Sequence, residues 1–131
     1  GKSTDDAGYI QVQRIAENTR QAVLALMADL RLDALVYATF DHQPVPIAPD
    51  VMIKLAIDDD RLGNNRVLSS ILGFPALTVP AGFTTDGLPV GIEFMSRPFS
   101  DAMLFRLGYA YEQGTHQRRP PTLTPALRGE P

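Results

Sequence analysis

The sequence contains no cysteine and no tryptophan, and it has two lysines and two histidines in 131 residues. The absence of cysteine excludes disulfides, thiolate metal sites and thiol nucleophiles, and it is typical of a reducing compartment. No apolar run approaches the ~20 residues that cross a bilayer, and the N-terminus lacks a secretion-signal pattern. We therefore expect a cytoplasmic protein that has no membrane partner.

The charge balance argues against a nucleic-acid partner. Lysine and arginine number 12 against 15 acidic residues, so the formal net charge is −3. The arginines are scattered and form no basic face that would neutralise phosphates. Hydrophobic residues make up 44% of the chain, which is enough for one core at this length. We expect a single α/β unit over residues 1–121 and an extended, proline-containing tail over residues 122–131.

The first half of the chain predicts a helix followed by a buried strand. Over residues 9–32 apolar side chains recur every three or four positions, which is typical of an amphipathic helix, and Asp5 and Asp6 could cap its start. The unbroken apolar run at residues 34–38 is typical of a strand covered on both faces. Three prolines then prevent regular structure in a long connection up to residue 57.

The second half predicts a helix, a hairpin and a last helix. A weaker helical pattern over residues 62–72 stops at Gly73. Asp86-Gly87 joins β-prone runs at residues 76–79 and 90–95, which is a strong hairpin signal. The final helix is expected to be largely buried, beginning after a capping serine and ending before a glycine, at Ser100 and Gly114. The fold class is therefore α/β, with a small mixed sheet and packing helices.

A search for chemistry finds no complete catalytic set. Three consecutive aspartates, residues 58–60, fit a helix start better than a metal site, because the alternating acidic pattern of a calcium loop is absent. His42 and His116 lie far apart and are most simply surface residues. The serine pair at residues 69–70 has no flanking glycines, and Lys54 lies in a loop. We expect no catalytic residue, no metal and no cofactor in this chain.

A series of motifs resembles the C-terminal section of the amidase signature family. Upstream of them, residues 32–39 look like a late core strand of that family, and Asn64-Asn65 looks like its asparagine-bearing helix. The motifs that carry the resemblance are GFPALTVPAGF (73–83), DGLPVG (86–91), RPFS (97–100), YAYEQ (109–113) and RRPP (118–121). The resemblance covers residues 9–121.

The resemblance implies part of a serine hydrolase that acts on carboxamides. In that family a serine is activated by a second serine and a lysine, and these groups lie N-terminal to the section matched here. The implied residues near a substrate pocket are Thr39, Phe40, Asn64 and Asn65. The sequence departs from many relatives at Ala38, where they have proline, which weakens the transfer of a role to Thr39.

Two functional hypotheses follow. The first is the C-terminal portion of an amidase, which lacks the Ser-Ser-Lys catalytic residues and is inactive alone. The sequence begins with Gly1 rather than methionine, which is expected of a processed chain, a tagged chain or a piece of a longer protein. The second is a free-standing, non-enzymatic α/β interaction module. The expected partners are a small carboxamide in the full enzyme and either a second copy of the chain or the N-terminal amidase portion, because unpaired strand edges favour association.

Overall fold

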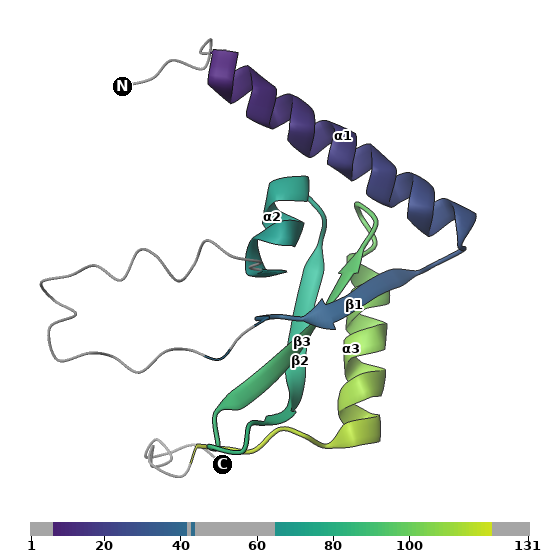
Figure 1. Ribbon diagram of the computed structural model, residues 1–131. Helices are drawn as coiled ribbons and strands as arrows, with labels where there is room; N and C mark the ends of the chain where they lie inside the picture. The colour runs from purple at the N-terminus through teal and green to yellow at the C-terminus, as the bar shows by residue number, and fades with distance from the viewer. Residues whose placement is uncertain (1–6, 42, 44–64, 122–131) are drawn as a thin grey trace, which may run out of the picture.

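The computed structural model describes residues 7–41, 43 and 65–121. Within these ranges, three helices and three strands follow the order that the sequence predicts, with α1 across one end of the molecule (Figure 1). No helix in the described ranges is long and apolar enough to cross a membrane. The elements are α1 (Ala7–Asp29), β1 (Ala34–Ala38), a 3-10 turn η2 (Asn65–Val67), α2 (Leu68–Leu72), β2 (Ala76–Phe83), β3 (Pro89–Ser96) and α3 (Asp101–Thr115).

The sheet has the strand order β1-β3-β2, so the hairpin strand β3 occupies the centre. Glu93 in β3 is paired with Tyr37 of β1 on one side and with Thr78 of β2 on the other. The α/β class is confirmed, with one difference: these three strands pair antiparallel throughout, where a mixed sheet was expected. The reason is topological, because β1 and β2 run in the same direction but the hairpin places β3 between them.

The side chains of the sheet form two cores, one on each face. Because successive residues of a strand point to opposite faces, neighbours in β3 contribute to different cores. Helices α1 and α2 pack on one face and α3 packs on the other. The buried apolar residues that form these two clusters are Leu72, Phe74 and Met95 on the α1 and α2 face, and Val79, Phe94 and Leu104 on the α3 face.

Two arginines tie α1 to the rest of the molecule. Arg20 donates from Nη1 to the carbonyl of Leu72 at 3.1 Å, and its guanidinium lies 5.4 Å from the ring centroid of Phe74. Arg97 donates from Nη2 to the carbonyl of Met27 at 3.0 Å, near the C-terminal end of α1. The bond from Arg20 satisfies a carbonyl at the end of α2, and the Met27 carbonyl accepts both from Arg97 and from the backbone amide of Leu32.

The apolar stripe of α1 is only partly covered. Met27 is fully buried, but Ile15 is 57% exposed and Leu30 is 59% exposed. Strand β1 is likewise not covered on both faces as predicted, because Val36 remains exposed. A three-stranded sheet is too small to cover a helix of 23 residues along its whole length.

The ends of the last two helices test the capping predictions. Helix α2 ends where predicted, at Gly73 with φ 66°. Helix α3 continues through Gly114 to Thr115, and His116 with φ 51° ends it instead. Ser100 makes no side-chain capping bond; its backbone carbonyl accepts from the amides of the first turn. The predicted caps at Asp5, Asp6 and residues 58–60 lie outside the described residues.

Candidate functional site

The described candidate residues meet where β1 ends. Thr39 and Phe40 follow the last residue of the strand, and Asn65 begins the turn η2. The Asn65 side chain donates from Nδ2 to the carbonyl of Ala38 at 3.2 Å, which ties both ends of the long connection together. Phe40 is half-exposed at this end of the strand. Asn64 lies outside the described residues.

The Thr39 hydroxyl is the one polar atom of this site that is buried without a partner among the described residues. Its backbone amide donates to the carbonyl of Gly91 at 3.0 Å, which extends the pairing of β1 with β3 by one residue. Its Oγ1 is buried and makes no hydrogen bond within the part of the chain that the structure describes. A buried hydroxyl normally finds a partner, because burying it unpaired costs free energy.

Gly91 leaves the space that Thr39 and Thr78 fill. A Cβ atom at Gly91 would lie 2.8 Å from Cγ2 of Thr78 and 3.1 Å from Oγ1 of Thr39. Both distances are below ordinary van der Waals contact, so a side chain here would push the two threonines aside. The glycine in the central strand therefore permits the close approach of its two neighbours.

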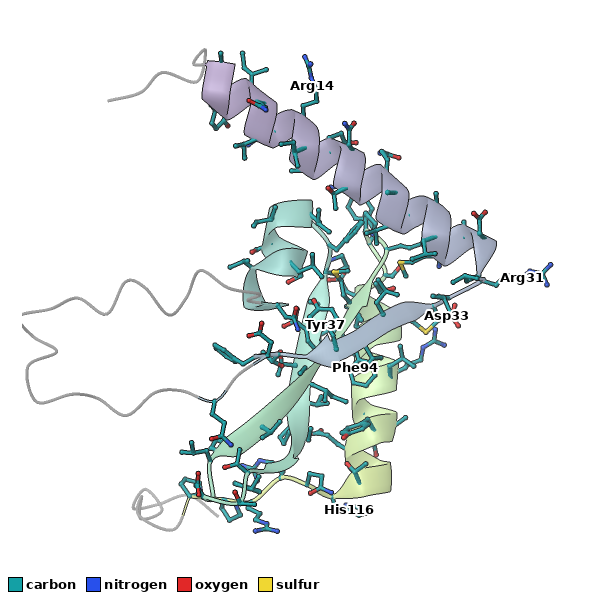
Figure 2. All side chains as sticks on the ribbon, in the orientation of Figure 1. Arg14, Arg31, Asp33, Tyr37, Phe94 and His116 are labelled. Atoms are coloured by element: carbon teal, nitrogen blue, oxygen red, sulfur yellow. The ribbon has the colours of Figure 1, made fainter. Side chains whose placement is uncertain are left out.

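A buried carboxylate, that of Glu93, lies two residues after Gly91 in β3 and on the same face of the sheet. Glu93 is 6% exposed and accepts a hydrogen bond from the Tyr37 hydroxyl at 2.6 Å. Its other oxygen accepts from the Thr78 hydroxyl at 3.3 Å. Figure 2 shows Tyr37 on the α2 side of β1, whereas Phe94, the next residue after Glu93, lies toward α3. One carboxylate thus connects all three strands on the α2 face.

Tyr37 keeps its proton in this environment. Burial raises the pKa of the Tyr37 phenol well above its ordinary value, and the hydrogen bond and negative charge of Glu93 raise it further. A hydrogen bond with the Ser69 hydroxyl opposes this shift. Because the Tyr37 hydroxyl donates to Glu93 and its pKa is raised, the phenol is a poor base for the Ser69 hydroxyl near neutral pH.

The other serines near the sheet are bonded to backbone carbonyls. Ser70 donates to the carbonyl of Val67 at 3.0 Å, and Ser96 donates to the carbonyl of Asp33 at 2.7 Å. A carbonyl oxygen is not a general base, so these bonds do not activate either hydroxyl. Within the ranges that the structure describes, no group of three or more histidine, aspartate or glutamate side chains could hold a metal ion.

Sequence reasoning missed the link between Tyr37 and Glu93. The only signal was an acidic residue within the β-prone run of residues 90–95. A lone glutamate in such a run is usually assigned to the solvent side. Its burial depends on the strand order, because the partners Tyr37 and Thr78 come from the two strands that flank β3.

The comparisons with known proteins identify the family. The profile of the family described as Amidase matches residues 1–105, so the chain belongs to the amidase family. The resemblance of its motifs to the amidase signature family is confirmed. The chain is 30% identical over 130 residues to one subunit of the glutamyl-tRNA(Gln) amidotransferase of Synechococcus sp., a match that covers 94% of this chain and 23% of that relative.

Solved structures support the same assignment. The peptide amidase from Stenotrophomonas maltophilia is 32% identical, with a TM-score of 0.68 over 92% of this chain and 23% of that enzyme. The allophanate hydrolase from Kluyveromyces lactis is 28% identical, with a TM-score of 0.64 over 88% of this chain and 19% of that enzyme. This chain therefore spans less than a quarter of each of these three relatives.

Proposed function

We propose that this chain is a section of a hydrolase that acts on the carbon–nitrogen bonds of carboxamides, that it borders the substrate pocket, and that it is inactive alone. Membership of the amidase family supports the reaction class, and the small share of each relative that the chain spans supports its being a section of a larger enzyme. The sequence has no Gly-Ser-Ser-Gly-like stretch, and its lysines are confined to positions 2 and 54.

The chemistry of amide hydrolysis explains the proposed inactivity. Acyl transfer needs a nucleophile, a base that removes its proton, and donors that stabilise the oxyanion. The Ser69 hydroxyl is hydrogen-bonded to a phenol that keeps its own proton, and the Ser70 and Ser96 hydroxyls donate to backbone carbonyls. The observation that carries the proposal is that the partners of these three hydroxyls within the described residues, a protonated phenol and two backbone carbonyls, include no base.

The pocket-border role is assigned to the end of β1. The half-exposed Phe40 ring could contact a carboxamide substrate directly, and the buried, unpaired Thr39 hydroxyl could bind it once the end of β1 opens, while Asn65 fixes the backbone that carries both residues. A carboxamide offers both a donor and an acceptor, which a hydroxyl can complement. Asn64 is proposed for the same border on the family resemblance alone.

Turnover of simple amides by the purified chain tests the proposed inactivity. The chain should release no ammonia from primary amides or peptide amides, and Ser69→Ala should match the unmodified chain. Ammonia release that Ser69→Ala abolishes would contradict the proposal, because it would identify a complete active site in this chain.

The border role is tested in a chimera in which this chain replaces the matched section of the S. maltophilia peptide amidase. Thr39→Val should raise KM for peptide amides with kcat nearly unchanged, because the hydroxyl binds substrate without taking part in bond cleavage. Thr84→Val, at the hairpin turn, is the matched control. Equal KM values for the Thr39→Val and Thr84→Val chimeras would refute the border role.

The second candidate is a non-enzymatic interaction module, which the exposed apolar residues favour. Phe99 is fully exposed, and Phe105 and Tyr109 are each 66% exposed. A reading frame that starts just before Lys2 would support the module, whereas upstream codons for a lysine and a Gly-Ser-Ser-Gly-like stretch would support the amidase section.

A further inference from the structure

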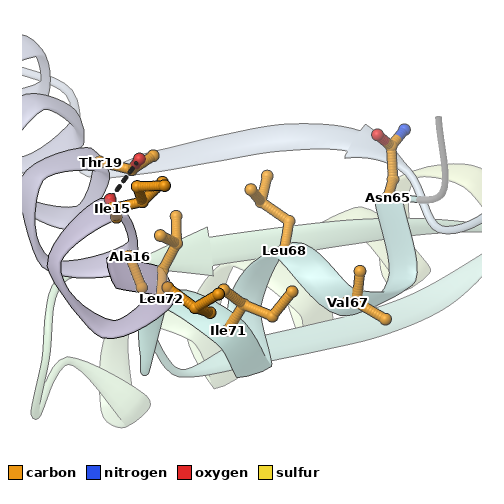
Figure 3. A pocket seen from close by; sticks show the side chains of 9 residues that line it. Ile15, Ala16, Thr19, Asn65, Val67, Leu68, Ile71 and Leu72 are labelled. Carbon is orange, nitrogen blue, oxygen red and sulfur yellow. Dashed lines mark hydrogen bonds between the residues drawn. The ribbon is translucent and has the colours of Figure 1, made fainter. Parts of the chain in front are cut away.

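One exposed apolar surface is the groove between α1 and α2. It encloses about 400 Å³ and is lined by Val12 and Ile15 from α1 and by Val67 and Ile71 from η2 and α2 (Figure 3). All four of these side chains are exposed, and Ile71 is 60% exposed. Apolar surface gathered in a concave site is typical of a contact with another polypeptide rather than of a solvent-facing helix pair.

The outer side of α3 carries a second apolar surface. Phe105 and Tyr109 lie one turn apart on this helix, so their rings are neighbours on one face. The buried side of the same helix is formed by residues such as Leu104 and Gly108. The sequence predicted a largely buried helix, and these two exposed rings are the part of that prediction that the structure contradicts.

The two surfaces belong to opposite layers of the fold. The groove is formed by the elements that pack on the Met95 face of β3, whereas α3 packs on the Phe94 face. A single two-fold axis brings one surface of a protein against the same surface of its copy. A homodimer of this kind would cover the groove or the α3 rings, and it would leave the other surface in water.

A larger polypeptide can cover both surfaces at once. More than three quarters of the S. maltophilia peptide amidase lies outside the part that this chain matches. We propose that the α1–α2 groove and the Phe105–Tyr109 face are both docking surfaces for the rest of an amidase polypeptide, which presents apolar side chains to each. This inference rests on the proposed function, and it adds which surfaces of the chain receive that partner.

Cysteine labelling tests the proposal, because the chain has no cysteine of its own. Ile15→Cys reports on the groove and Phe105→Cys on the α3 face. Arg14→Cys is the control, since Arg14 points away from the molecule in Figure 2. Each variant is prepared both as the isolated chain and within the peptide amidase chimera, and maleimide reaction rates are compared by mass spectrometry.

The proposal predicts that all three cysteines react at similar rates in the isolated chain. In the chimera, Ile15→Cys and Phe105→Cys should react at least ~10-fold more slowly than Arg14→Cys, because they react only when the interface opens. A folded, monomeric chimera in which either patch cysteine reacts as fast as the control would overturn the proposal. Activity does not enter this readout, so a folded but inactive chimera would leave the docking result intact.

If the chimera is insoluble, the isolated chain allows a second, independent test of the proposal. Light scattering and labelling are then followed over a dilution series. Self-association that protects both Ile15→Cys and Phe105→Cys would assign the two surfaces to further copies of this chain and would overturn the proposal. Reaction of both cysteines at the control rate at every concentration would support a different polypeptide as the partner.

Discussion

Removing the Tyr37 hydroxyl tests the role of the buried Glu93 carboxylate in holding the three strands together. Tyr37→Phe deletes the donor at 2.6 Å and leaves a 6% exposed carboxylate with the longer bond from Thr78 at 3.3 Å. A hydrogen bond to a charged group contributes about 1.5–3 kcal/mol. We therefore expect the free energy of unfolding to fall by about 2 kcal/mol.

Urea and thermal unfolding, followed by circular dichroism, measure this loss. With an unfolding entropy of ~2.1 cal/mol/K per residue, a loss of about 2 kcal/mol corresponds to a fall in Tm of about 7 °C for a chain of this length. Tyr109→Phe is the matched control, because its ring is 66% exposed and its loss should stay within ~0.5 kcal/mol.

A double variant separates the charge from the packing. In Tyr37→Phe/Glu93→Gln the unpaired charge is gone, so the combined loss should be smaller than the sum of the two single losses. If Tyr37→Phe costs no more than Tyr109→Phe, the carboxylate does not depend on its tyrosine, and the reasoning from burial and hydrogen bonding is refuted.

The remaining predictions concern pH, packing and the attachment of α1. Because the folded state raises the pKa of Tyr37, its contribution to stability is complete below pH ~10 and is lost as the pH rises further; Tyr37→Phe should weaken this alkaline loss in urea titrations. Gly91→Ala should lower the free energy of unfolding by about 1–3 kcal/mol, because the new Cβ atom contacts Thr78 and Thr39. Gly114→Ala, where no atom lies within 4 Å of the new Cβ, should instead stabilise α3 by up to ~1 kcal/mol. Equal changes in Tm for the two variants would contradict this reasoning. Arg20→Ala should lower stability by about 1–2 kcal/mol through loss of the bond to Leu72 and the contact with Phe74, and Arg14→Ala should leave the urea midpoint unchanged.

Local signals in the sequence were enough to predict most of the elements. Strand β1 has the predicted bounds, because a short apolar run has few alternatives. The hairpin follows from Asp86-Gly87, where Gly87 adopts φ 82° as the turn requires. The end of α2 at Gly73 follows from the same freedom of glycine at positive φ.

Features that depend on long-range contacts were not predictable in this way. The end of α3 is set by His116 rather than by Gly114, because a helical glycine is tolerated where the next turn still pairs. The burial of Glu93 requires the strand order, and the exposure of Phe105 requires knowing which face of α3 meets the sheet. Apolar periodicity predicts that a face will be covered, and it does not specify which polypeptide covers it.

The candidate site rests on the family resemblance. Thr39, Phe40 and Asn65 were chosen from the family resemblance, and the structure places them together at the end of β1. Their contact with a substrate stays a prediction. The unpaired Thr39 hydroxyl could not be read from the sequence, because it results from the close approach of β1 to Gly91.

Labelling of the purified chain with a fluorophosphonate is the sharpest test of the proposed inactivity. Such reagents form a covalent bond with serines that a neighbouring base activates. We expect an unchanged intact mass, because Ser69 meets a phenol with a raised pKa and Ser70 meets a backbone carbonyl. A stoichiometric mass increase that maps to Ser69 or Ser70 would contradict the proposal, since this chain would then carry an activated nucleophile of its own.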